Sequence, residues 1–191
     1  LAAENGVVVG AGEYDYSTVL EIKAEPNEGY HFVRWSDGNE NPIRTVVVTS
    51  DIELFAEFEI NRYSVILHAT NGSVSGVGEY EYGTTITITA IPDSGYEFVK
   101  WSDGDDRNER IFEITSNIDL TAEFAKEIRE VVVLAENGIV VGAGRYEYGA
   151  EATLNAIPNE GCHFVGWSDG EISALRTITM LTDTVFTAEF A

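Results

Sequence analysis

The chain is poor in the residues that build disulfides and cysteine metal sites. It has one cysteine, Cys162, among 191 residues. An intramolecular disulfide is therefore excluded, and so is any metal site that needs two or more thiolate ligands. No stretch approaches the ~20 consecutive apolar residues of a membrane helix, and no basic segment precedes an apolar one as in a signal peptide. We expect no direct membrane insertion.

Basic residues are also scarce. The chain has 11 Lys and Arg against 33 Asp and Glu, which gives a formal net charge of −22 at pH 7. A surface this acidic repels phosphate backbones and anionic lipid headgroups. Nucleic acid is therefore excluded as an expected partner.

The most informative feature of the sequence is a decapeptide that occurs three times. It reads GYHFVRWSDG at 29–38, GYEFVKWSDG at 95–104 and GCHFVGWSDG at 161–170. The spacing is 66 residues, and no insertion or deletion interrupts it. A fixed period of this length predicts tandem copies of one small structural unit.

We accordingly divide the chain into three repeats, which cover residues 1–60, 61–125 and 126–191. The joins between them contain no run of Gly, Pro or Ser, whereas a flexible linker would be rich in those residues. We expect consecutive repeats to lie close together with limited freedom, arranged as an elongated rod.

The first repeat is short at its beginning. Leu1 aligns with Leu67, so the segment NRYSVI at 61–66 has no counterpart before it, and the chain does not begin with Met. We interpret this as a trimmed end with more protein upstream. The alternative is a first repeat that lacks the start of its first strand and leaves an edge unpaired.

Strand patterns are clearest in the second repeat. Residues 63–69 are rich in β-branched and apolar residues, and the Asn-Gly pair that follows is typical of a hairpin turn. Residues 79–92 alternate apolar and polar residues, which predicts one long strand with a buried face. Residues 110–115 and 118–124 are predicted to form a closing hairpin.

Helical periodicity is weak throughout, since Gly, Pro, Asn and Thr interrupt every long run. We predict an all-β fold with five or six short strands per repeat and at most one helical turn. The residues expected to form most of the core are the aromatic ones, in the first repeat Tyr14, Tyr16, Tyr30, Phe32, Trp35 and Phe58.

Three motifs together carry a family resemblance. In the first repeat they read NGVVVGAGEYDYST, AEPNEGYHFVRWSDG and RTVVVTSDIELFAEF. This order resembles the divergent internalin-type B repeat, which occurs in tandem in large bacterial surface and secreted proteins. The resemblance covers nearly the whole chain as three units. One departure is Ser17, which stands where Gly83 and Gly149 occupy a turn.

The resemblance implies a compact, β-grasp-like fold for each repeat. It implies an extracellular module between a ligand-binding region and a cell-wall or membrane anchor, with no catalytic residues. We therefore expect no enzyme. The expected function is a structural spacer or stalk in a bacterial cell-surface or secreted protein, which presents an adjacent functional region.

Two features suggest binding instead. The loop after the second decapeptide is dense in carboxylates, and Asp103, Asp105 and Asp106 are weak candidates for a calcium site. The simpler interpretation is that Asp-Gly forms a tight turn there.

The repeated tryptophans could also stack on sugars, although a core role is commoner for a ring in such a strand. The alternative function is therefore an adhesive or carbohydrate-binding module. Its partners would be a host or cell-surface protein or a glycan, besides the neighbouring repeats and domains of the same chain. The candidate ligand contacts are Trp35, Trp101 and Trp167.

Overall fold

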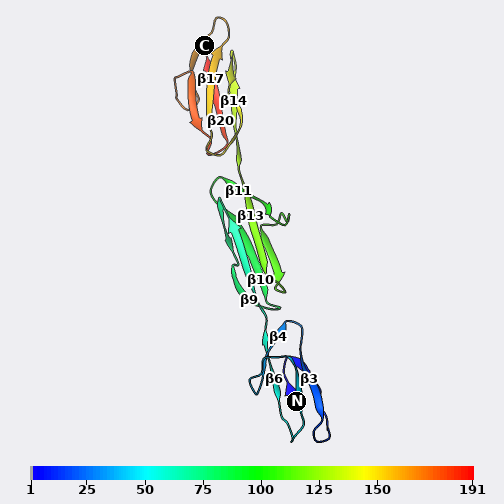
Figure 1. The fold of residues 1–191 in the computed structure, drawn as a ribbon. Helices are drawn as coiled ribbons and strands as arrows, with labels where there is room; N and C mark the ends of the chain where they lie inside the picture. Colours follow the sequence, from blue (N-terminus) through cyan, green and yellow to red (C-terminus); the bar gives the residue numbers. More distant parts are fainter. Residues whose placement is uncertain (1) are drawn as a thin grey trace. The chain divides into compact units, whose positions relative to one another are not determined.

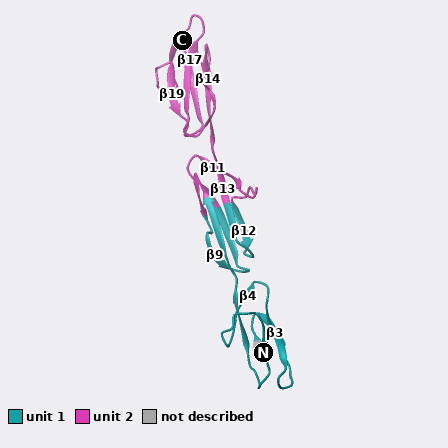
Figure 2. Cartoon of the chain, viewed as in Figure 1, with its two compact units in different colours: residues 1–68, 75–89, 109–120 teal, residues 69–74, 90–108, 121–191 magenta. Residues whose placement is uncertain are grey.

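The computed structural model describes residues 2–191, and every regular element in that range is a β-strand (Figure 1). Residues 2–191 contain no helix long and apolar enough to cross a membrane. The chain divides into two compact units, residues 1–68, 75–89 and 109–120 and residues 69–74, 90–108 and 121–191 (Figure 2). The all-β prediction is confirmed.

The third repeat folds into two sheets. One has the strand order β16-β14-β20-β18 and the other β15-β17-β19. The first and last strands of the repeat, β14 and β20, pair in parallel, while β16 and β18 run antiparallel to their neighbours. The strands are β14 (Ile128–Ala135), β15 (Gly138–Val141), β16 (Gly144–Glu147), β17 (Glu151–Pro158), β18 (Phe164–Trp167), β19 (Leu175–Thr179) and β20 (Thr184–Phe190).

The second repeat has the same seven strands, in sheets ordered β11-β13-β7-β9 and β12-β10-β8. They are β7 (Arg62–Ala69), β8 (Gly72–Ser75), β9 (Gly78–Glu81), β10 (Thr85–Pro92), β11 (Tyr96–Trp101), β12 (Glu109–Glu113) and β13 (Ile118–Lys126).

The first repeat has fewer strands among its described residues. Its sheets are ordered β1-β6-β4 and β2-β3-β5. The strands are β1 (Ala2–Ala3), β2 (Gly6–Val9), β3 (Val19–Pro26), β4 (Tyr30–Trp35), β5 (Ile43–Val47) and β6 (Phe55–Ile60). No strand between residues 10 and 18 corresponds to β9 or β16.

The second and third repeats each have one strand more than the five or six predicted. The alternating segment 79–92 is two strands, because Gly83 adopts a left-handed backbone (φ +77°) and turns the chain between β9 and β10. The two halves then join different sheets. Alternation revealed the buried face of each half, but it carries no information on which strand lies beside it.

Both predicted hairpins are wrong for the same reason. The Asn-Gly turn at 71–72 connects β7 to β8, and residues 114–117 connect β12 to β13, but each pair lies in two different sheets. These turns carry the chain from one sheet to the other. A short connection constrains the distance between strand ends and does not require the strands to pair.

The cores of the first and third repeats each draw on both sheets of the repeat. In the first repeat Ile22 and Ala24 of β3 are buried with Ala56 and Phe58 of β6. In the third repeat one buried cluster joins side chains of both sheets. Its members are Val131, Ala152, Leu154, Ala156, Trp167, Met180, Phe186 and Ala188. The first and third repeats thus have separate hydrophobic cores.

Candidate functional site

The three repeated tryptophans are core residues. Trp35 and Trp101 are 0% exposed and Trp167 is 3% exposed. Each ring packs against the phenylalanine three residues earlier, with centroids 5.5–5.8 Å apart. A sugar stacks on an exposed ring face, and these rings offer none in this structure. The burial of these rings favours the core role, and the carbohydrate contact of Trp35, Trp101 and Trp167 stays a prediction.

The indole N–H of each tryptophan is also satisfied. Trp35 Nε1 donates to the carbonyl of Asn41 at 2.9 Å, and Trp101 Nε1 donates to that of Arg107 at 2.9 Å. Trp167 makes the same bond with Ser173. The ring thus anchors the acidic loop that follows it, because a buried N–H without a partner would destabilise the fold.

An arginine clamps the acidic loop in the first and third repeats. Arg44 Nη1 donates to Asp37 at 2.8 and 2.6 Å, and Arg176 donates to both oxygens of Asp169 at 2.8 Å. In each case the hydrogen bond from arginine is the main reason that the pKa of the aspartate is lowered. Sequence reasoning missed these arginines, although they keep the 66-residue period.

Two of the three candidate calcium ligands of the second repeat, Asp103 and Asp105, form hydrogen bonds within the loop. Asp105 accepts bonds from the backbone N–H of Arg107 at 2.9 Å and from its guanidinium at 3.1 and 2.6 Å. Asp103 Oδ1 accepts from the Asp105 N–H at 3.3 Å, whereas Asp106 is exposed. Within residues 2–191 no group of three His, Cys, Asp or Glu side chains could hold a metal ion. Calcium binding stays a prediction.

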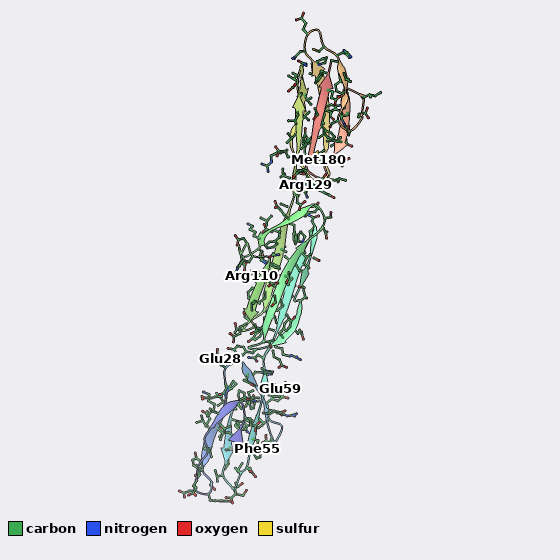
Figure 3. All side chains as sticks on the ribbon, turned by 180° about the vertical axis from the view of Figure 1, so that it is seen from behind. Glu28, Phe55, Glu59, Arg110, Arg129 and Met180 are labelled. Atoms are coloured by element: carbon green, nitrogen blue, oxygen red, sulfur yellow. The ribbon has the colours of Figure 1, made fainter. Side chains whose placement is uncertain are left out.

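A different set of residues joins the first repeat to the second. The side chain of Tyr82 lies against Gly29, so closely that a β-carbon on residue 29 would overlap its ring. Its hydroxyl donates to Glu28 Oε1 at 2.6 Å, and this bond raises the pKa of Tyr82. Glu28 is labelled in Figure 3. The Asn61 N–H donates to the Gly29 carbonyl at 2.7 Å, and the Tyr82 N–H donates to the Asn61 carbonyl at 2.9 Å.

The same arrangement joins the second repeat to the third. Tyr148 lies against Gly95, and Glu127 bridges them with backbone bonds of 2.9 Å to Gly95 and 2.8 Å from Tyr148. Arg129 (Figure 3) forms an ion pair with Glu127, and its guanidinium lies 6.0 Å from the centre of the Tyr148 ring. We call each Gly–Tyr contact with its backbone bridge a repeat junction.

The equivalent positions at the two ends of the series differ. Tyr16, which corresponds to Tyr82 and Tyr148, is 77% exposed, so it does not belong to the predicted aromatic core. Gly161 has nearly the same backbone angle as Gly29 and Gly95, φ +84° against +82° and +80°, but no described atom lies within 4 Å of its added β-carbon. The equivalent tyrosine rings of the second and third repeats are therefore packed where each meets the junction glycine of the preceding repeat.

Comparison with known protein families finds the same three repeats in the chain. The divergent InlB B-repeat domain matches three times, over residues 1–62, 63–128 and 130–191. The chain belongs to this family. The internalin-type resemblance drawn from the motifs is thereby confirmed, with three copies.

Two relatives come from Evansella cellulosilytica. One, named "Putative membrane protein", is 30% identical over 184 residues, which cover 90% of this chain and 27% of the relative. The other, named "Putative Gly-rich membrane protein", is 33% identical over 159 residues, which cover 75% of this chain and 18% of the relative. The chain thus spans less than a third of either relative.

Proposed function

We propose that the chain is a non-catalytic spacer of a bacterial cell-envelope protein. It holds an adjacent functional region away from an anchor, on the extracellular side of the membrane. The proposal rests on its membership of a tandem B-repeat family and on relatives that are named as membrane proteins.

The observation that carries the proposal is the repeat junction. A spacer keeps its two ends apart only if consecutive repeats cannot fold back on each other. The bridging residue of each junction, Asn61 or Glu127, has its N–H and its carbonyl bonded to opposite repeats. The packed Gly–Tyr pair adds a second restraint, because the tyrosine ring lies directly against the glycine backbone of the preceding repeat. The junction supports a semi-rigid connection.

The acidic surface also suits this role. Only 11 basic residues accompany 33 acidic ones, and like charges repel over roughly 8–10 Å at physiological salt. Such repulsion keeps separate copies apart and opposes the folding of one repeat onto the next.

Small-angle scattering of the 191-residue chain tests the spacer. We expect an elongated particle about three repeats long, with a maximum dimension that does not change between low and moderate salt. A compact globule, or a dimension that collapses when salt screens the acidic surface, would contradict the proposal. The chain should also show no binding on a glycan array, since an adhesive role is the competing function.

A further inference from the structure

The strands that begin and end a repeat lie side by side in the same sheet. In the third repeat these are the first strand, β14, and the last strand, β20 (Figure 1). The two strands are parallel, and their five pairs run from Val131↔Thr184 to Ala135↔Ala188. We call this ladder the terminal-strand clamp. A pull on the chain from both sides of the repeat therefore acts first on the clamp.

The parallel direction of the strands decides how such a pull acts. Tension draws the beginning of β14, at Ile128, away from the end of β20, at Phe190, and these lie at opposite ends of the parallel pair. The two strands are then forced to slide along each other. The evenly spaced hydrogen bonds of a parallel ladder stretch together under this load. An antiparallel hairpin pulled at its two free ends instead opens one pair at a time.

Buried side chains on both strands oppose the sliding. Val131 is 1% exposed, Phe186 8% and Ala188 2%, and all three belong to the core cluster of the third repeat. A slip of one residue would turn every side chain of the strand to the opposite face, so these apolar groups would enter water. The clamp therefore cannot shift by small steps and must give way as a unit.

A side-chain hydrogen bond closes the clamp where β14 enters it. Asp183 Oδ1 accepts this bond from the Glu130 N–H at 2.8 Å, immediately before the first pair of the ladder. The second repeat has the same bond, from the Ser64 N–H to Asn117 Oδ1 at 2.9 Å. Its first and last strands, β7 and β13, are also neighbours. The arrangement therefore occurs in both of these repeats.

The connections between repeats contain little chain that could absorb tension. Only Asn61 separates β6 from β7, and only Glu127 separates β13 from β14. The strand that ends one repeat thus continues almost directly into the strand that begins the next. Tension passes from one repeat to the following one without first extending a loop.

We propose that the repeats resist mechanical tension and that the terminal-strand clamp is the part that bears it. A pull between the anchor and the adjacent functional region supplies the tension, so this inference rests on the proposed spacer function. The clamp adds to that function a resistance to forced unfolding that depends on the direction of pulling. Forced unfolding is governed by the contacts that break at the transition state and need not follow overall stability.

Single-molecule pulling on the intact 191-residue chain tests this dependence on direction. Pairs of introduced cysteines serve as handles, after Cys162→Ala removes the native thiol. Ile128→Cys with Glu189→Cys pulls the clamp along its strands, and Ile128→Cys with Thr182→Cys opens it from one end. The three handle positions are exposed. Both pairs enclose most of the third repeat, since they lie 61 and 54 positions apart.

We expect the unfolding force at equal loading rate to be at least about twofold higher along the strands than from one end, because the five pairs then break together. An equal or lower force along the strands would overturn the proposal. Scattering of the same variants keeps this result apart from the spacer function. An elongated particle with equal forces would contradict the clamp alone, and a compact particle with the higher force along the strands would contradict the spacer alone.

A matched pair of valines separates the clamp from general stability. Val133 of β14 is paired with Phe186 in the clamp, and Val140 of β15 is paired with Ala156 in the other sheet. Both valines are partly buried against the same core cluster, so Val133→Ala and Val140→Ala should lower the melting temperature by similar amounts. Only Val133→Ala should lower the unfolding force along the strands. An equal fall in force for Val140→Ala would overturn the assignment to the clamp.

Discussion

Tyr82 of the second repeat packs on Gly29 of the first, and any side chain at position 29 would overlap its ring. The backbone angle of Gly29, φ +82°, is already one that favours glycine. Two independent requirements thus select glycine at this position. At Gly161 only the backbone requirement applies, because no described atom lies near its added β-carbon. Substitutions at a junction glycine and at Gly161 therefore distinguish the stability of the turn from the packing of one repeat on the next.

The first prediction concerns the junction glycines. Gly95→Ala should both destabilise its turn, by about 1 kcal/mol, and loosen the second junction, because Tyr148 must move. Gly161→Ala should have the first effect alone. Scattering should show a broader range of particle dimensions only for Gly95→Ala. Equal broadening in both variants would mean that the tyrosine contact does not restrict the junction.

The tyrosine partner gives a matched pair of variants. Tyr148→Ala should loosen the second junction, whereas Tyr16→Ala should change little because that ring is 77% exposed. Distance distributions between labels placed in the second and third repeats would report the loosening. A distribution as narrow as that of the parent chain would show that the backbone bridge through Glu127 is sufficient.

Ser17 offers a stability prediction. It has φ +68°, where the equivalent residues are Gly83 at +77° and Gly149 at +78°, and a left-handed backbone costs a non-glycine residue roughly 1–2 kcal/mol. Its N–H donates to the Val48 carbonyl at 2.7 Å, so the turn is kept in spite of this strain. Ser17→Gly should raise the free energy of unfolding of the first repeat by about 1 kcal/mol, measured by urea denaturation.

The reciprocal change is the control for Ser17. Gly149→Ser should destabilise the third repeat by a similar amount, because the same turn there would acquire the same strain. The prediction for Ser17 would be contradicted if Ser17→Gly lowered stability. Such a result would mean that glycine favours the unfolded chain more than it relieves the turn.

The clamped aspartates predict a dependence on acid. Arg44 lowers the pKa of Asp37, and Arg176 lowers that of Asp169. A folded-state pKa below the unfolded value, about 3.9, means that this stabilisation is complete above that value. It is lost as the pH falls through the lower, folded-state pKa. Asp37→Asn should reduce the loss of first-repeat stability between pH 5 and pH 2, roughly the window in which a native carboxylate is protonated. Urea denaturation across this pH range measures the free energy of unfolding. If the variant lost as much stability between pH 5 and pH 2 as the parent chain, the prediction would be contradicted.

Calcium gives a direct test of the second acidic loop. We expect excess calcium to leave the melting temperature unchanged, because Asp105 already accepts three bonds from Arg107. An increase that disappears in Asp105→Asn would establish a site there. An increase that persists in that variant would indicate general screening of the acidic surface.

The tryptophan variants bear on the glycan alternative. Trp101→Ala should destabilise the second repeat by about 3–5 kcal/mol, because it empties a fully buried position. A loss of glycan binding in such a variant would therefore report unfolding. Trp101→Phe preserves most of the packing and is the informative comparison; binding that is lost in this folded variant would support a role for the indole.

The sequence by itself determined the repeat, its period and its β character. Regular spacing of Trp35, Trp101 and Trp167 and the alternation in segment 79–92 follow from local geometry, since successive strand residues face opposite sides. The family followed from the same local motifs. These features depend on residues close together in the chain, so a single sequence is enough to read them.

Only the tertiary structure decided which strands pair and which aromatic residues are buried. Trp35 is fully buried while Tyr16, in an equally regular pattern, is 77% exposed, because burial depends on what lies opposite. Gly29 and Tyr82 are 53 positions apart, so nothing local in either motif indicates their contact. Packing between distant segments is set by the whole fold, and the sequence pattern of one segment cannot specify it.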